Sequence, residues 1–304
     1  MRIRQLQCFV VLAEELNFTR AARRLNMSQP PLSLQIQALE RTVGTALFQR
    51  TSRRMTLTSA GEVFLRRARS ILAQHDRALL EVQEVLSGQH GTLDIGATGS
   101  ILRAGLADLL AQFCREHPLI SVRLHEQAPA LQVSDLLSGR MDISFNRSVP
   151  YHDDLSCQLA WREELVVLLP PDHPLGAERS LSIDDLRHEK HVILRPDSSD
   201  FAAFILSILT QGGARPRVSQ QVIDAQSIPS LVSAGFGIGL VPAGIAATAA
   251  PLIHRPIAPD PPVSDIFAVY RRGETTPALA ALLATLQRSF PQDREEKQRA
   301  TVLD

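Results

Sequence analysis

The chain has 304 residues, enough for about two domains of ordinary size. Hydrophobic residues make up 44% of the sequence, so each domain can bury a core, which excludes a disordered chain or a peptide hormone. The 32 basic residues equal the 32 acidic residues in number, so the whole molecule has no net charge that would hold it to nucleic acid or anionic lipid.

The charge is nevertheless distributed unevenly. Residues 1–58 contain nine arginines and three acidic residues, a net charge of +6, and the remaining residues carry −6. The nine are Arg2, Arg4, Arg20, Arg23, Arg24, Arg41, Arg50, Arg53 and Arg54. A basic segment attached to an acidic body suggests a polyanion partner for that segment alone.

The cysteines and the apolar stretches place the chain in the cytoplasm. Cys8, Cys114 and Cys157 lie far apart and form no CxxC motif, so neither a disulfide framework nor a zinc site is predicted. The first apolar run ends at Glu14 and is too short for a signal peptide. The uncharged stretch 225–253 is divided by three prolines, which favours buried elements of a soluble domain over a membrane span.

Three short helices are predicted in the basic segment. Apolar residues from Ile3 to Ala13 recur at helical spacing, and Thr19 can cap a second helix that runs to Leu25. After a short turn, Ser28 can cap a third helix whose first turn holds two prolines.

The third helix and the segment after it carry side chains suited to DNA. Its apolar positions fix an inner face, so Gln29, Ser33 and Gln37 lie on the outer face, where they can read base edges in a major groove. This is the helix-turn-helix arrangement, and the alternative is a solvated helix pair in a small bundle. Residues 48–58 predict two short β segments around a basic tip, which can place Arg53 or Arg54 on a phosphate or in a minor groove.

One long helix is predicted over residues 59–87. Ser59 and Glu62 fit a capping box, with Thr58 as the alternative cap. At 1.5 Å per residue such a helix extends about 42 Å, so its apolar stripe needs a partner. We expect the same helix of a second chain, and the alternative is packing along the body of the same chain. The predicted dimerisation residues are Phe64, Ala68, Ile71, Leu72, Leu79, Val82 and Leu86.

Two stretches of the remaining chain follow the same strand, turn, helix and strand plan. In the first, the strands are 93–97 and 121–126 and the helix is 101–117. In the second, the strands are 191–194 and 217–223 and the helix is 200–211. The alternation predicts two similar α/β subdomains with parallel sheets, between which a ligand binds at the carboxyl ends of the strands.

The chemistry of this cleft favours an anion. Ser100 and Ser198 or Ser199 are predicted at helix N-termini, whose free N–H groups attract negative charge, and Arg147 and Arg195 add positive charge. The predicted ligand is therefore a small carboxylate. The alternatives are simple helix caps for the serines and surface ion pairs for the arginines.

The basic segment resembles the winged helix-turn-helix of the LysR-type transcriptional regulators. The resemblance is carried by Thr19 to Leu25, Ser28-Gln29-Pro30-Pro31-Leu32-Ser33, Leu39-Glu40, Gly44, Leu47-Phe48, Arg50, Leu57-Thr58 and Gly61. It implies that Gln29, Pro30 and Ser33 face bases. It also implies that Ser28, Arg50, Ser52 and Arg53 face the DNA backbone or the minor groove. Many members have Arg or Lys where this chain has Leu34 and Gln37.

The body resembles the effector domain of the same family. The motifs are Leu136 to Asp142, Leu169 to Leu175, Leu186, and Val232 to Pro242. The resemblance implies an α/β effector region of two Rossmann-like subdomains, similar to the type 2 periplasmic-binding-protein fold, behind an all-α winged helix-turn-helix domain and a linker helix. By the same resemblance, Ser100, Arg147 and Pro196 lie near the effector.

The predicted domains follow from these motifs. They are the DNA-binding domain 1–58, the linker helix 59–87, the hinge 88–91 and the effector-binding domain 92–304, with subdomain I from 92–162 and 265–290 and subdomain II from 163–264. We expect a transcriptional regulator that binds promoter DNA as a homodimer or homotetramer and responds to a small organic acid, with RNA polymerase as a further partner. No membrane, metal or cofactor is predicted.

Two other classes of protein are weaker hypotheses. An intracellular solute-binding protein without a DNA-binding role would leave the basic segment unexplained. An enzyme with a Ser and His pair in the cleft would need an activated nucleophile, and no GxSxG motif is present. The glycines from Gly235 to Gly239 lead from a helix into a strand, the reverse of a dinucleotide-binding turn.

Overall fold

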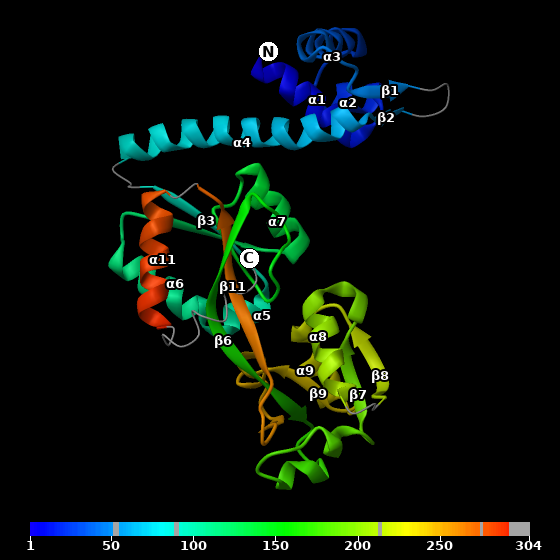
Figure 1. The fold of residues 1–304 in the computed structure, drawn as a ribbon, viewed down its shortest axis with the longest axis vertical. Helices are drawn as coiled ribbons and strands as arrows, with labels where there is room; N and C mark the ends of the chain where they lie inside the picture. Colours follow the sequence, from blue (N-terminus) through cyan, green and yellow to red (C-terminus); the bar gives the residue numbers. More distant parts are fainter. Residues whose placement is uncertain (51–54, 88–90, 212–214, 274–275, 292–304) are drawn as a thin grey trace.

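The structure of the protein, a computed structural model, describes residues 1–50, 55–87, 91–211, 215–273 and 276–291. It has three parts, which Figure 1 shows from top to bottom. A small N-terminal head lies on one end of the long helix α4 (Ser59–Ser87), and an α/β body lies beneath the helix.

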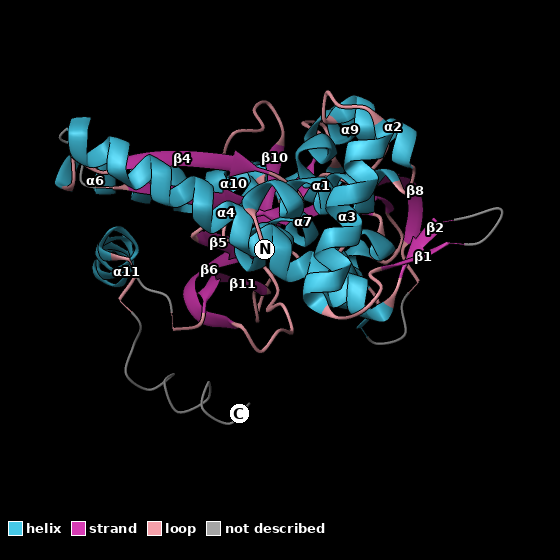
Figure 2. Cartoon of the chain, turned by 90° about the horizontal axis from the view of Figure 1, so that it is seen from above, coloured by secondary structure: helices cyan, strands magenta, loops and turns pink. Residues whose placement is uncertain are grey.

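The head contains the predicted helices and hairpin. The helices are α1 (Ile3–Glu15), α2 (Phe18–Arg24) and α3 (Gln29–Val43), and strands β1 (Phe48–Arg50) and β2 (Met55–Leu57) pair antiparallel. Their shared core is closed by apolar residues from all three helices, including Phe9, Ala21 and Ile36, each fully buried. Helix α3 lies on the side of the head away from the body, and the hairpin lies at the edge of the molecule (Figures 1 and 2).

Two of the predicted helix caps differ from those in the structure. Helix α2 is capped by Asn17, whose side chain accepts a hydrogen bond from the Arg20 amide at 3.0 Å, and Thr19 already lies inside the helix. Ser28 occupies the N-cap position of α3, but its side chain accepts no capping hydrogen bond. At the start of α4 the Thr58 hydroxyl accepts a hydrogen bond from the Gly61 amide at 3.0 Å, so the alternative cap is the one formed.

Helix α4 belongs to the head along its first half only. The Phe64 ring lies 5.1 Å from the Phe9 ring, and Ala68 is fully buried in the head core. The second half extends beyond the head (Figure 1), and there Leu79 is 57% exposed and Val82 is 61% exposed. The apolar stripe that the sequence shows as continuous is therefore divided between an internal core and a free surface.

The upper part of the body is built on a mixed sheet. Strand β3 (Thr92–Ala97) pairs in parallel with β4 (Ser121–Glu126) and with β5 (Ile143–Asn146). Strand β11 (Val263–Arg271) pairs antiparallel with β5 on one side and with β6 (Leu155–Leu169) on the other. One face packs against α6 (Ala107–Glu116) and α11 (Pro277–Ser289), and the other packs against α7 (Pro129–Ser138). The predicted parallel pairing of strands 93–97 and 121–126 is confirmed, and the sheet as a whole is mixed because β11 returns from the far end of the chain and pairs antiparallel.

The predicted helix 101–117 is interrupted. It consists of α5 (Gly99–Ile101), a wider turn over Leu102–Leu106 and α6. Gly105 has a φ of 109° inside this turn, a conformation that other residues rarely adopt and that kinks the helix. Apolar periodicity does not report such a kink, so the sequence predicted a single helix.

The lower part of the body contains the second α/β unit. Strand β7 (Lys190–Leu194) pairs in parallel with β8 (Arg217–Val222), and the second half of β6 pairs antiparallel with β9 (Gly239–Pro242) and β10 (Ile253–Pro256). Its helices are α8 (Asp200–Leu209), α9 (Ile228–Ser233) and α10 (Ala243–Ala246), with short 3-10 turns at Pro174–Ala177, Asp184–Leu186, Pro196–Ser198 and Ala225–Ser227. None of the helices in the described ranges is long and apolar enough to cross a membrane.

The buried His191 makes the stability of this unit depend on pH. His191 is 2% exposed, and its Nε2 donates a hydrogen bond to the Leu186 carbonyl oxygen at 2.9 Å. Burial lowers the pKa of His191 below its ordinary value of 6.5. The unfolded chain therefore binds a proton that the folded chain does not, and folding stability decreases as the pH falls below 6.5.

We predict that His191→Gln flattens this dependence, because glutamine keeps a donor for Leu186 but does not titrate. The measurement is the melting temperature at pH 7 and at pH 5. The wild type should lose more stability over this interval than the variant, and replacement of the exposed His254 by Gln should leave the wild-type loss intact. An equal loss in wild type and His191→Gln contradicts the role of His191.

Candidate DNA-binding interface and effector cleft

The predicted DNA-reading residues lie together on α3. Leu32, Ile36 and Leu39 point into the head core and are fully buried, which turns the opposite face of the helix to solvent. Ser28, Gln29, Pro30 and Gln37 are exposed, and Ser33 is partly exposed. Since α3 also lies on the side of the head away from the body (Figure 1), nothing in the described body covers this face.

The hairpin is fixed to α3 by Glu40. One carboxylate oxygen of Glu40 accepts hydrogen bonds from the amides of Leu47 at 2.9 Å and Phe48 at 3.3 Å. A helix face and a wing held in one geometry can contact neighbouring grooves of a duplex. Of the predicted wing residues, Ser52, Arg53 and Arg54 lie outside the described residues, as does the side chain of Arg50.

Some of the basic charge of the head is used internally. Arg24 pairs with Glu14 at 2.9 Å, and Arg20 pairs with Glu15 at 3.2 Å, which ties α2 to the end of α1. Glu14 also pairs with Arg69 of α4 at 3.0 Å. The net charge of +6 already subtracts Glu14 and Glu15, so these ion pairs leave it unchanged and fix only where the paired arginines lie.

In the body, Arg147 lies between the two subdomains. Its buried guanidinium donates from Nη1 to the Ser264 hydroxyl at 2.9 Å, and Nη2 forms an ion pair with the buried Glu163. It also lies 4.8 Å from the centre of the Phe201 ring, which belongs to the first turn of α8. Glu163 in turn accepts a hydrogen bond from the Gly244 amide at 2.7 Å. Arg147 thus contacts both subdomains.

The positive charge of Arg147 is neutralised by a buried partner that the sequence did not predict. Burial lowers the pKa of Arg147, and the Glu163 carboxylate opposes this effect. The ion-pair alternative is the one formed, although the pair is buried rather than on the surface. Sequence reasoning missed Glu163 and Phe201, because no local pattern marks a partner on another strand or another subdomain.

Ser100 lies at a second contact between the subdomains. It is 8% exposed, and its hydroxyl lies 3.1 Å from that of Thr98. A side chain at the neighbouring Gly99 would come within 1.8 Å of the Gln226 amide nitrogen, so the two subdomains meet here closely. Arg103 donates to the side chains of Gln226 and Thr248, each at 3.1 Å, and holds this edge of the cleft together.

The other predicted effector residues precede α8. Ser199 caps this helix by accepting a hydrogen bond from the Ala202 amide at 3.2 Å, and the Ser198 hydroxyl donates to the Arg195 carbonyl oxygen at 2.6 Å. Arg195 is exposed and pairs with Asp197 at 2.8 Å. The loop with Pro196 therefore leads into the helix that carries Phe201, beside Arg147, but its own polar groups already have partners.

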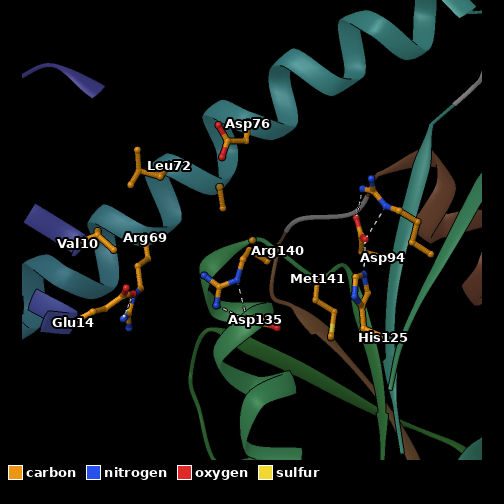
Figure 3. A pocket seen from close by; sticks show the side chains of 13 residues that line it. Val10, Glu14, Arg69, Leu72, Asp76, Asp94, His125, Asp135, Arg140 and Met141 are labelled. Atoms are coloured by element: carbon orange, nitrogen blue, oxygen red, sulfur yellow. Dashed lines mark hydrogen bonds and ion pairs between the residues drawn. The ribbon is translucent and has the colours of Figure 1, made fainter. Parts of the chain in front are cut away.

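A cavity of about 470 Å³ lies elsewhere, between the head, α4 and the body. Figure 3 shows Glu14 and Arg69 on its head side, and Asp135 with Arg140 on its body side. None of the predicted effector residues lines it. At its edge α4 touches the end of α7, where a side-chain carbon on Gly139 would lie 3.9 Å from that of Ala73. In the described ranges no cluster of three His, Cys, Asp or Glu residues could hold a metal ion.

A head with an exposed polar helix face, joined by a long helix to a body of two α/β subdomains, is the architecture of a DNA-binding regulator with a separate effector domain. Two family models match the chain: "Bacterial regulatory helix-turn-helix protein, lysR family" over residues 3–62 and "LysR substrate binding domain" over residues 86–291. The chain belongs to the LysR family of DNA-binding transcriptional regulators. Its body is the effector-binding domain of that family, and the family is not one of enzymes.

Named relatives and solved structures agree with this assignment. The chain is 37% identical over 247 residues to the HTH-type transcriptional regulator AlsR of Bacillus subtilis, covering 80% of each protein. It is 33% identical to XapR of Escherichia coli, covering 93% of this chain and 97% of that protein. Its fold is similar to CbnR alone and in complex with target DNA, with a TM-score of 0.74 for both and 29% and 30% identity. These cover 96% and 95% of this chain, and all of CbnR.

The cost of breaking the buried ion pair between Arg147 and Glu163 can be predicted. Arg147→Met leaves the Glu163 carboxylate buried without its cation, so we expect a loss of roughly 3 to 5 kcal/mol in the free energy of unfolding. Glu163→Gln in the same chain removes the stranded charge and keeps an acceptor for Gly244, so the double variant should recover part of that loss. Urea unfolding followed by the fluorescence of the single tryptophan, Trp161, measures both. Equal losses in the single and double variants contradict this account of the pair.

Proposed function

We propose that the outward face of α3 reads the bases of a promoter operator through Gln29, Pro30, Ser33 and Gln37. The observation that carries this proposal is the exposure of hydrogen-bonding side chains on the face opposite a fully buried one. Amide and hydroxyl groups match the edges of bases in a major groove. Ser28 and the wing residues Arg50, Ser52, Arg53 and Arg54 would contact the DNA backbone or a minor groove.

We also propose that the second half of α4 pairs with a second copy of the chain. Of the residues expected in this contact, Ala68 is fully buried in the chain's own head, and Phe64, Ile71 and Leu72 are partly buried against its core. Leu79 and Val82 remain as exposed apolar side chains, and the side chain of Leu86 lies outside the described part. A homodimer through these residues, or a homotetramer of two such dimers, is the assembly that binds a two-fold operator.

A small carboxylate is the effector that we propose for the cleft. In support, Arg147 is a buried cation beside an aromatic ring, and its Nε has no hydrogen-bond partner among the described residues. A carboxylate arriving there competes with Glu163, which also holds Gly244 of subdomain II. Binding would then alter contacts between the subdomains and, through α7 and α4, the position of the head.

The proposed DNA target also indicates where the protein acts and with which further partner. We propose that the protein acts in the cytoplasm, with RNA polymerase as a partner at the promoter. We propose a DNA-binding domain 1–58, a linker helix 59–87, a hinge 88–91 and an effector-binding domain 92–304, with subdomain I from 92–162 and 265–290 and subdomain II from 163–264. Residues 88–90 of the hinge lie outside the described residues.

The first test concerns base reading. Gln29→Ala should weaken binding to the DNA upstream of the protein's own coding sequence by about tenfold, because one amide-to-base contact is lost. Binding to a random fragment should change little. Fluorescence anisotropy with both duplexes at two salt concentrations measures this, and Gln74→Ala on exposed α4 is the control. Equal losses on both duplexes argue against base reading by Gln29.

The second test concerns assembly. The double variant Leu79→Glu and Val82→Glu places charge on the exposed half of α4, so we expect dimers to dissociate into monomers. Sedimentation velocity at micromolar concentration gives the mass directly. Val63→Glu alters an exposed apolar residue of α4 at the end attached to the head and should keep the wild-type mass. A double variant with the wild-type mass shows that the dimer forms elsewhere.

A further inference from the structure

The centre of the outward face of α3 is apolar. Pro30, Leu34, Gln37 and Arg41 follow one another at intervals of four, three and four residues, and all four are exposed. Leu34 lies in the middle of this row and is 62% exposed. It is the largest apolar side chain on a face that otherwise offers amide groups, a proline ring and, near its end, a guanidinium.

This position places an apolar side chain where DNA bases would lie. Residues 29–37 contain no Lys, Arg, Asp or Glu, so the first two turns of α3 have no guanidinium for a guanine and no carboxylate for a cytosine. In the major groove thymine presents a methyl group, which apolar side chains contact, and glutamine amides pair well with adenine. The side chains on this face therefore match A·T and T·A pairs.

We infer that Leu34 is a specificity-determining residue that packs on the 5-methyl group of a thymine in the operator half-site. The inference rests on the proposed base reading by α3 and adds a residue and a base to it. Burying one methyl group against Leu34 removes apolar surface of both from water, and deoxyuridine in place of thymine removes that gain. The effect expected for one buried methyl is about fourfold in affinity.

The experiment uses a duplex selected from a random library by the full-length protein. Each thymine of one half-site is replaced in turn by deoxyuridine, and binding is measured by fluorescence anisotropy at constant salt. For the wild type, one replacement should weaken binding by about fourfold. For Leu34→Ala, the parent duplex should bind more weakly and that same replacement should have no further effect. Since Leu34 is exposed, the variant should keep the wild-type melting temperature.

Val63→Ala alters another apolar residue that is 53% exposed, on α4 rather than on the reading face, and should keep the full response to deoxyuridine. If every replacement has the same effect on wild type and Leu34→Ala, Leu34 is an ordinary surface residue and the inference is wrong. If no sequence is enriched in the selection, the proposed base reading itself fails.

A second variant tests the base that Leu34 faces. Leu34→Arg supplies a guanidinium that pairs with guanine, so at the methyl-sensitive position it should prefer G·C to T·A by about tenfold. Comparison of the two duplexes cancels the general gain in phosphate attraction from the added charge. A Leu34→Arg protein that keeps the thymine preference at that position overturns the inference as well.

Discussion

The apolar stripe of α4 connects every part of this molecule. In its first half, Phe64 and Ala68 complete the core of the head, so the three short helices do not close their core alone. A few residues further along, Ala73 touches the end of α7 in the body, and beyond it Leu79 and Val82 are exposed. Because one rigid helix serves core, body and free surface, a shift at any of these contacts is carried to the others.

A buried ion pair lies where the two subdomains meet. Arg147 is buried with Glu163, and both groups also contact the second subdomain, through Phe201 and Gly244. A buried ion pair costs desolvation and stabilises little by itself, but it is sensitive to the arrival of a competing charge. Together with the hydrogen bond from Arg103 to Gln226, this pair holds the two subdomains against each other.

Helix α7 lies between strand β4 of the body and the linker helix α4. Its N-terminus follows the carboxyl end of β4, and the C-cap residue Gly139 lies beside Ala73 of α4. The cavity between head and body adjoins this contact, and Asp135 of α7 pairs there with Arg140. A ten-residue helix is about 15 Å long, so α7 spans the distance from the end of β4 to the linker helix.

The sequence by itself determined the local elements and the family. Helical spacing placed α1, α3 and α4 close to their observed bounds, and the polar outer face of α3 followed from its buried one, because these are properties of neighbouring residues. The sequence also returned residues 265–290 to subdomain I, but only the tertiary structure decided the antiparallel pairing of β11, the partner of Arg147 and the division of the α4 stripe. Each of these depends on contacts between segments that are far apart in the chain. The spacing of residues along the sequence does not indicate which distant segments pack together.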